Sequence, residues 1–171
     1  IIGTYWLMRP LKDGLFINIV GKNFLPFAKI LSLGLIIPLV LIYAKLVDLV
    51  EKQKLFYILC GFYAGVFLVI AFLLGHPTIG LANTIPHPSI FLGWAIYLSV
   101  ESFGSLLISL FWSFVASNTD TASAKRGYGC IIFGAQIGSM AGPSLAIHAN
   151  YFGMSLLTSF VAIGLVIAPL L

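Results

Sequence analysis

Long apolar stretches separated by short polar connections most constrain how this chain folds. Six stretches have about the 20 mainly apolar residues that a helix needs to cross a bilayer. They cover residues 1–20, 26–47, 55–74, 89–116, 128–149 and 152–171. Their apolar residues are continuous and do not alternate with polar ones as in membrane-spanning strands, so the sequence predicts transmembrane helices.

The scarcity of charged residues excludes a soluble domain. Charged residues make up 8% of the chain and apolar residues 60%, whereas soluble domains carry roughly 25% charged residues. The same apolar excess excludes a disordered chain. We therefore expect an all-α, multi-pass integral membrane protein with six transmembrane helices. Because the sequence begins and ends inside apolar stretches, we also expect it to be a fragment.

The distribution of lysine and arginine indicates which connections face the cytoplasm. Five basic residues lie in or beside the connections that follow the second and fourth stretches: Lys45, Lys52, Lys54, Lys125 and Arg126. The opposite side has Lys22, with Lys29 just inside the second stretch. The positive-inside rule places the first two connections in the cytoplasm. Six spans with both ends cytoplasmic are typical of one half of a twelve-helix carrier built from two repeats.

A charged run interrupts the first stretch at residues 9–13. Ionisable residues at membrane depth cost about 2.5–3.5 kcal/mol on insertion scales, so they face a partner or an aqueous pathway. On a helix, Arg9 and Lys12 share a face, Asp13 lies one turn from Arg9, and Pro10 frees a backbone carbonyl. The run predicts either a clamp for phosphate or carboxylate groups, or a helix end with snorkelling cations and an Arg9–Asp13 pair. Lys29 either snorkels outward or adds to the clamp.

Glu101 is a second charged residue at membrane depth, surrounded by mainly apolar sequence over residues 89–113. Its partner has to come from another helix, and the candidates are Lys12, Arg9 and Lys29. The pattern favours a functional carboxyl group, either a proton carrier or a gate that pairs with Lys12 when substrate is absent. A purely structural ion pair is the alternative.

Small residues recur at every fourth position of the fifth stretch. Gly134, Gly138 and Gly142 lie one turn apart and are followed by Pro143. This spacing favours close approach of a neighbouring helix, with a hinge or gate as the alternative. Gln136 is the polar group of this stretch best suited to reach a substrate or a partner helix.

No motif predicts enzyme chemistry. The spacing of His76, His87 and His148 matches no zinc site, and Cys60 and Cys130 lie in apolar runs without a CxxC pattern. The sequence has no phosphate-binding glycine-rich loop, nucleophile elbow or nucleic-acid-binding surface. We expect no catalytic residue, metal, cofactor or nucleic-acid partner.

Several short runs together resemble a known family. They are RPLKD at 9–13, LPFAK at 25–29, YAKL at 43–46, KLFY at 54–57, VESFGSLLISLFWSFVASN at 100–118, AKRGY at 124–128 and GAQIG at 134–138. In this order the chain resembles the ATP/ADP translocase family of intracellular bacteria and plastids, a branch of the major-facilitator superfamily. The resemblance implies the N-terminal half of a twelve-helix carrier in a bacterial cell membrane or plastid envelope. Its partners would be the lipid bilayer and the carrier's C-terminal half.

That family exchanges external ATP for internal ADP, with or without phosphate, and some members import nucleotides with protons. The lysine and glutamate that the family needs for transport match Lys12 and Glu101, which the cost of burying charge also selects. The resemblance therefore predicts ATP/ADP antiport by alternating access, with Lys12 and Arg9 holding phosphates and Glu101 coupling gate and substrate. A proton-coupled importer of another organic anion and a non-transporting module fused to a regulatory domain are the alternatives. Gly14, where threonine is usual, leaves the substrate open.

Overall fold

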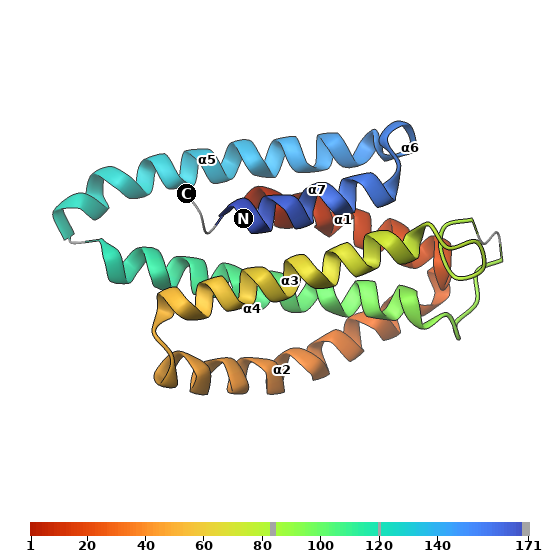
Figure 1. The fold of residues 1–171 in the computed structure, drawn as a ribbon, viewed down its shortest axis with the longest axis horizontal. Helices are drawn as coiled ribbons and strands as arrows, with labels where there is room; N and C mark the ends of the chain where they lie inside the picture. The colour runs from red at the N-terminus through yellow and green to blue at the C-terminus, as the bar shows by residue number, and fades with distance from the viewer. Residues whose placement is uncertain (83–84, 120, 169–171) are drawn as a thin grey trace.

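The computed structural model describes residues 1–82, 85–119 and 121–168, and its regular elements are all helical. They are α1 (Ile2–Ile19), η1 (Lys22–Phe24), α2 (Leu25–Leu49), α3 (Lys52–Leu74), α4 (Phe91–Asn118), α5 (Thr121–Ile147), α6 (Ala149–Phe152) and α7 (Met154–Ile167). The long helices run alternately in opposite directions along one axis (Figure 1). The all-α fold predicted from the sequence is confirmed.

Glycine and proline set several of the helix boundaries. Gly21 follows α1 with φ of 115°, and Gly153 separates α6 from α7 with φ of 81°. Residues with a β-carbon rarely adopt this part of backbone space, so glycine allows the chain to turn sharply at both places. Pro26 occupies the first turn of α2. Backbone N–H groups in the first turn have no acceptor within the helix, so the absence of an N–H in proline costs no helical hydrogen bond there.

Four helices in the described part of the chain are long and apolar enough to cross a membrane. They comprise residues Lys22–Leu49, Lys52–Leu74, Phe91–Ser117 and Gly127–Ile147. The other two long helices differ from these four in composition or length. Helix α1 has three charged side chains within its 18 residues, and α7 has 14 residues. The six predicted crossings thus correspond to four long apolar candidates, one charged helix and one shorter helix.

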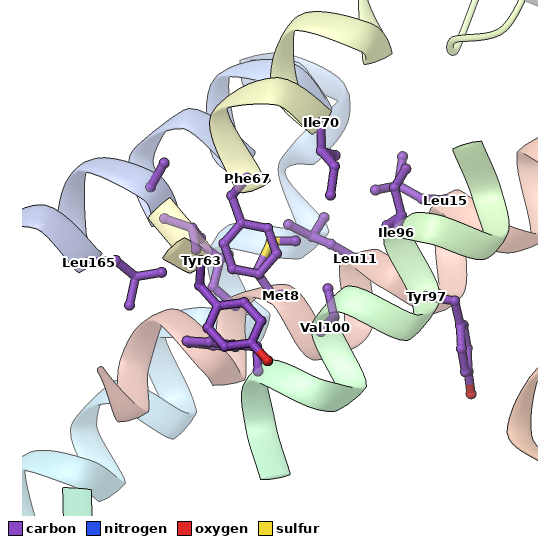
Figure 2. Close-up of a cluster of buried hydrophobic side chains, with 14 of the residues drawn as sticks. Met8, Leu11, Leu15, Tyr63, Phe67, Ile70, Ile96, Tyr97, Val100 and Leu165 are labelled. Carbon is purple, nitrogen blue, oxygen red and sulfur yellow. The ribbon is translucent and has the colours of Figure 1, made fainter. Parts of the chain in front are cut away.

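Helix α1 contacts α2, α4, α5 and α7. It packs against α4 and α5, while α7 packs mainly against α3, and α2 packs mainly against α4. Figure 2 shows part of the apolar core, where α1, α3 and α4 contribute Met8, Phe67 and Val100. In contrast, α2 buries only Ala28 and Ser32 within this chain. Its exposed apolar surface is suited to lipid.

The two basic connections lie at the same end of the bundle. Helices α2 and α3 meet there, and α4 ends where α5 begins (Figure 1, left). Lys54 is exposed at this end, and its Nζ lies 3.1 Å from Glu51 Oε2. The side chains of Lys125 and Arg126 lie outside the described residues. The two basic connections therefore lie on one side of the bundle, as the positive-inside rule requires. That this side faces the cytoplasm stays a prediction.

Candidate functional site

An ammonium group held by two carboxylates joins α1 to α4. The Nζ atom of Lys12 lies 2.7 Å from Asp13 Oδ1 and 2.9 Å from Glu101 Oε1. The side chain of Lys12 is 5% exposed, whereas those of Asp13 and Glu101 are 43% and 28% exposed. The ammonium group is therefore buried, whereas both carboxylate side chains are partly exposed. Of the three candidate partners of Glu101, which were Lys12, Arg9 and Lys29, the structure places Lys12 beside it.

Two glycines of α4 allow α1 to pack closely on either side of this ion pair. A β-carbon at Gly93 would meet the side chain of Val20, and one at Gly104 would meet the ring of Tyr5. Glu101 lies between these two glycines in sequence. Close packing at both points brings its carboxylate within reach of a lysine on α1.

Aromatic rings line one side of the lysine. Lys12 Nζ lies 4.1 Å from the centroid of the Tyr97 ring, one helical turn before Glu101 on α4. The ring of Phe16 contacts Tyr97 at 5.2 Å and Trp94 at 5.1 Å between centroids. The sequence did not single out Tyr97 as a contact of Lys12. Its four-residue spacing from Glu101 is the signal that could have identified it, because such residues share a helix face.

Arg9 points away from this site although it belongs to the same charged run. It is exposed, and its Cζ atom lies 5.2 Å from the centroid of the Trp6 ring. The Arg9–Asp13 pair that was one alternative is absent from the described residues, because Asp13 pairs with Lys12 instead. A buried ammonium needs charge compensation more than an exposed guanidinium does, which explains this choice of partner.

Two other predicted substrate contacts lie apart from Lys12 and Glu101. Lys29 is exposed on α2, and its carbonyl oxygen accepts a hydrogen bond from Ser32 Oγ at 2.8 Å. Gln136 is exposed on α5, where Ser139 Oγ lies 3.3 Å from its Oε1 atom. Within the described part of the chain, neither side chain forms a hydrogen bond or ion pair with Lys12 or Glu101. The structure thus does not assemble the wider cationic clamp.

Close packing of α5 on α1 involves two of the three regularly spaced glycines. A β-carbon at Gly142 would lie 2.7 Å from the backbone nitrogen of Leu7, and one at Gly138 would lie 2.9 Å from Gly3 Cα. Gly134 differs, because a β-carbon there would meet no atom within 4 Å. The backbones of the two helices therefore approach closely at Gly138 and Gly142 but not at Gly134.

Pro10 of α1 and Pro143 of α5 line one small cavity. Its volume is about 280 Å³, and Gly14 also contributes to its wall. A helical proline removes one backbone hydrogen bond from its own helix. The two interrupted turns thus lie beside each other, next to the charged run of α1.

A larger cavity lies between α3 and α4, away from the charged residues. Its volume is about 860 Å³, and its walls include Gly61, Gly65 and Phe91 together with other mainly apolar residues. Ser89 and Ser99 are the polar residues of its wall, which has no charged side chain to compensate a phosphate or carboxylate group. Within the described residues, no group of three or more histidine, cysteine, aspartate or glutamate side chains could hold a metal ion.

Comparison with known proteins identifies similar sequences. A family model described as TLC ATP/ADP transporter matches residues 1–83. ADP,ATP carrier protein 1 of Rickettsia prowazekii (strain Madrid E) is 30% identical over 171 residues, covering 89% of this chain and 34% of that protein. ADP,ATP carrier protein 1 of Chlamydia muridarum (strain MoPn / Nigg) is 32% identical over 168 residues, covering 83% of this chain and 31% of that protein.

A further relative is ADP,ATP carrier protein 5 of Rickettsia prowazekii (strain Madrid E). It is 28% identical over 142 residues, covering 71% of this chain and 28% of that protein. The chain thus spans about a third of the length of the curated relatives it matches. No solved structure matches it.

Proposed function

Since this chain belongs to the TLC ATP/ADP transporter family and is a multi-pass membrane protein, we propose that it forms part of a secondary-active carrier that exchanges ATP for ADP by alternating access. The family consists of transporters and not of enzymes. In our proposal the chain supplies the N-terminal half of a major-facilitator carrier. A C-terminal half of the same carrier would complete the substrate pathway.

The observation that carries this proposal is the ion pair between Lys12 and Glu101. A lysine at membrane depth is costly unless it is paired or serves a pathway. Here a single ammonium group contacts two carboxylates, Asp13 and Glu101, and one cation with two ionised carboxylates has a net negative charge. A nucleotide phosphate would be repelled by this arrangement. The arrangement therefore suits a carrier without bound substrate.

Binding of a phosphate group to Lys12 requires at least one carboxylate to withdraw. Asp13 is the next residue on the same helix, so its withdrawal changes no contact between helices. Glu101 lies on α4, so its withdrawal breaks the ion pair that ties α4 to α1. Replacement of Glu101 by phosphate thus couples substrate binding to release of an interhelical contact, which is the coupling that alternating access needs.

The other cationic and polar residues have secondary roles in this proposal. Arg9 is exposed one turn before Lys12 and lies against Trp6, so its side chain would have to turn from Trp6 toward Lys12 to meet a second phosphate of the nucleotide. Lys29 and Gln136 would contact substrate only if α2 and α5 line the same pathway. Pro10 and Pro143, in adjacent interrupted turns, would allow α1 and α5 to bend during the cycle.

Uptake of labelled ATP followed by a chase with unlabelled ADP tests this function. The natural chain that contains these residues is expressed at its whole length in cells, and its amount in the membrane is measured. Saturable uptake with ADP-triggered efflux is expected for the natural sequence. Lys12→Ala and Glu101→Gln are expected to insert normally and to lose exchange.

Lys54→Ala provides a control, because the Lys54–Glu51 pair is exposed at the end of the bundle and exposed pairs contribute little to stability. It should retain exchange. Normal exchange by both Lys12→Ala and Glu101→Gln would refute the site. Uptake that follows the proton gradient and needs no counter-substrate would refute antiport and favour the proton-coupled importer. Absence of uptake by the inserted natural chain would refute nucleotide transport.

A further inference from the structure

We propose that Tyr97 is a positioning residue whose ring fixes the Lys12 ammonium group at the interface of α1 and α4 independently of the two carboxylates. The Nζ atom lies 4.1 Å from the ring centroid, well within the distance of about 6 Å at which a cation and an aromatic face attract each other. Both side chains are buried. Desolvation strengthens this attraction, because little water competes for the ammonium.

The ring itself is held from a second side. Phe16 lies one turn after Lys12 on α1, and its ring meets Tyr97 at 5.2 Å with an interplanar angle of 62°. It also meets Trp94 of α4 at 5.1 Å and 88°. Such edge-to-face contacts are favourable and specific in geometry. The Tyr97 ring is thus part of a packed aromatic cluster, whereas Glu101 is a partly exposed carboxylate.

The different chemistry of ring and carboxylate determines what each does when an anion arrives. A phosphate competes with Glu101 for the ammonium and repels its charge. The ring of Tyr97 has no net charge, so it neither competes with phosphate nor is displaced by it. Lys12 therefore keeps one fixed contact on α4 while its ionic partner is exchanged. Without the ring, the ammonium would follow the carboxylates toward the exterior.

Chemical accessibility of Lys12 tests this positioning without any transport measurement. The purified natural chain is treated with a membrane-permeant acetylating reagent, and modification of Lys12 is measured by mass spectrometry relative to exposed Lys29. We expect Tyr97→Met to raise modification of Lys12 at least threefold and Tyr97→Phe, which keeps the ring, to leave it unchanged. Tyr97→Leu replaces Tyr97→Met if the latter fails to insert.

A matched control removes another buried ring from the same helix. Phe103 contacts Tyr63 and Phe67 at 5.4 Å each and has no ring or ionic contact with Lys12 among the described residues. Phe103→Leu therefore removes core packing of α4 and should not increase modification of Lys12. An equal increase in Phe103→Leu and Tyr97→Met would overturn the proposal, since it would show general loosening of the bundle. Unchanged modification of Lys12 in Tyr97→Met would also overturn it.

The consequence for transport rests on the proposed function and is measured separately. Tyr97→Met is expected to raise the KM for ATP about tenfold with Vmax within twofold of the natural chain, which corresponds to about 1.4 kcal/mol of substrate affinity. Tyr97→Phe should restore the natural KM. A lower Vmax at unchanged KM would indicate a purely structural ring and would overturn the positioning role. If the natural chain moves no nucleotide, the proposed function fails while the accessibility result still decides the role of Tyr97.

Discussion

The contact between α5 and α1 at Gly142 gives a quantitative test of how these helices pack. A β-carbon at Gly142 would lie 2.7 Å from the backbone nitrogen of Leu7 and 2.8 Å from the carbonyl carbon of Trp6. Favourable contacts between such atoms lie at about 3.5–4.0 Å. Both atoms belong to the backbone, so no change of rotamer relieves the overlap. Gly142→Ala therefore forces the two helices apart by about 1 Å.

The expected loss of stability follows from two opposing terms. Overpacking a tight interface costs about 1–3 kcal/mol, and a clash with backbone belongs near the upper value. Alanine favours the helix by about 1 kcal/mol relative to glycine, which offsets part of this cost. Gly142→Ala should thus lower the free energy of unfolding by about 2 kcal/mol. The β-carbon of Gly134→Ala would meet no atom within 4 Å. This variant therefore has no overpacking cost and gains only the greater helix propensity of alanine.

Thermal unfolding in detergent, followed by tryptophan fluorescence, measures the difference. At roughly 2–4 °C per kcal/mol for a unit of this size, Gly142→Ala should lower Tm by about 4–8 °C. Gly134→Ala should melt at or above the temperature of the natural chain. Equal Tm values for the two variants, or a larger loss for Gly134→Ala, would refute the backbone contact between α1 and α5.

Two further predictions concern the ion pair and the cysteines. The first exchanges the two charges by combining Lys12→Glu with Glu101→Lys. This variant should regain neither the proposed ATP/ADP exchange nor full thermal stability, because a carboxylate at position 12 would lie beside Asp13. Full recovery of exchange would show that only opposite charge at the two positions matters. In detergent, Cys130 should react with N-ethylmaleimide while Cys60 stays unmodified, because Cys130 is exposed and Cys60 is buried. Mass spectrometry measures the modification of both, and equal modification would contradict the packing of α3.

Much of the helical structure could be predicted because apolar length determines it. Helix α2 covers Leu25–Leu49 where the sequence indicated residues 26–47, and α3 covers Lys52–Leu74 where it indicated 55–74. Helix α5 begins at Thr121, seven residues before the expected start at 128. Hydropathy marks where a segment can enter lipid, whereas backbone hydrogen bonding continues through polar residues. The polar sequence at 121–127 is therefore helical.

The candidate site was only partly predictable. Lys12 and Glu101 could be selected one at a time, because a charged residue at membrane depth needs a compensating interaction wherever it lies. Their pairing depends on the rotation of α1 against α4, which the contacts of Gly93 and Gly104 determine. Tyr97 shares a helix face with Glu101 by its four-residue spacing, but the spacing does not show that its ring lies near the ammonium group, which depends on the packing of α1 against α4.

The unequal burial of the three charged residues predicts that stability and transport will respond differently to their loss. Removing one carboxylate, by Asp13→Asn or Glu101→Gln, leaves Lys12 with the other, so each single variant should lose little thermal stability. Removing both leaves an ammonium whose side chain is 5% exposed without a counter-charge. Leaving a buried charge unpaired costs about 3–5 kcal/mol. The double variant should therefore lose far more than the sum of the single losses.

Adding Lys12→Met to that double variant tests the origin of the loss. Methionine at this buried position needs no counter-charge and fills a similar volume, so the triple variant should regain most of the lost Tm. It should not regain the proposed ATP/ADP exchange, because the buried ammonium group that binds phosphate in our proposal is gone. Additive losses in the double variant would mean that water reaches Lys12 as readily as it reaches the carboxylates. The ion pair would then be a surface contact, and phosphate could bind without displacing Glu101.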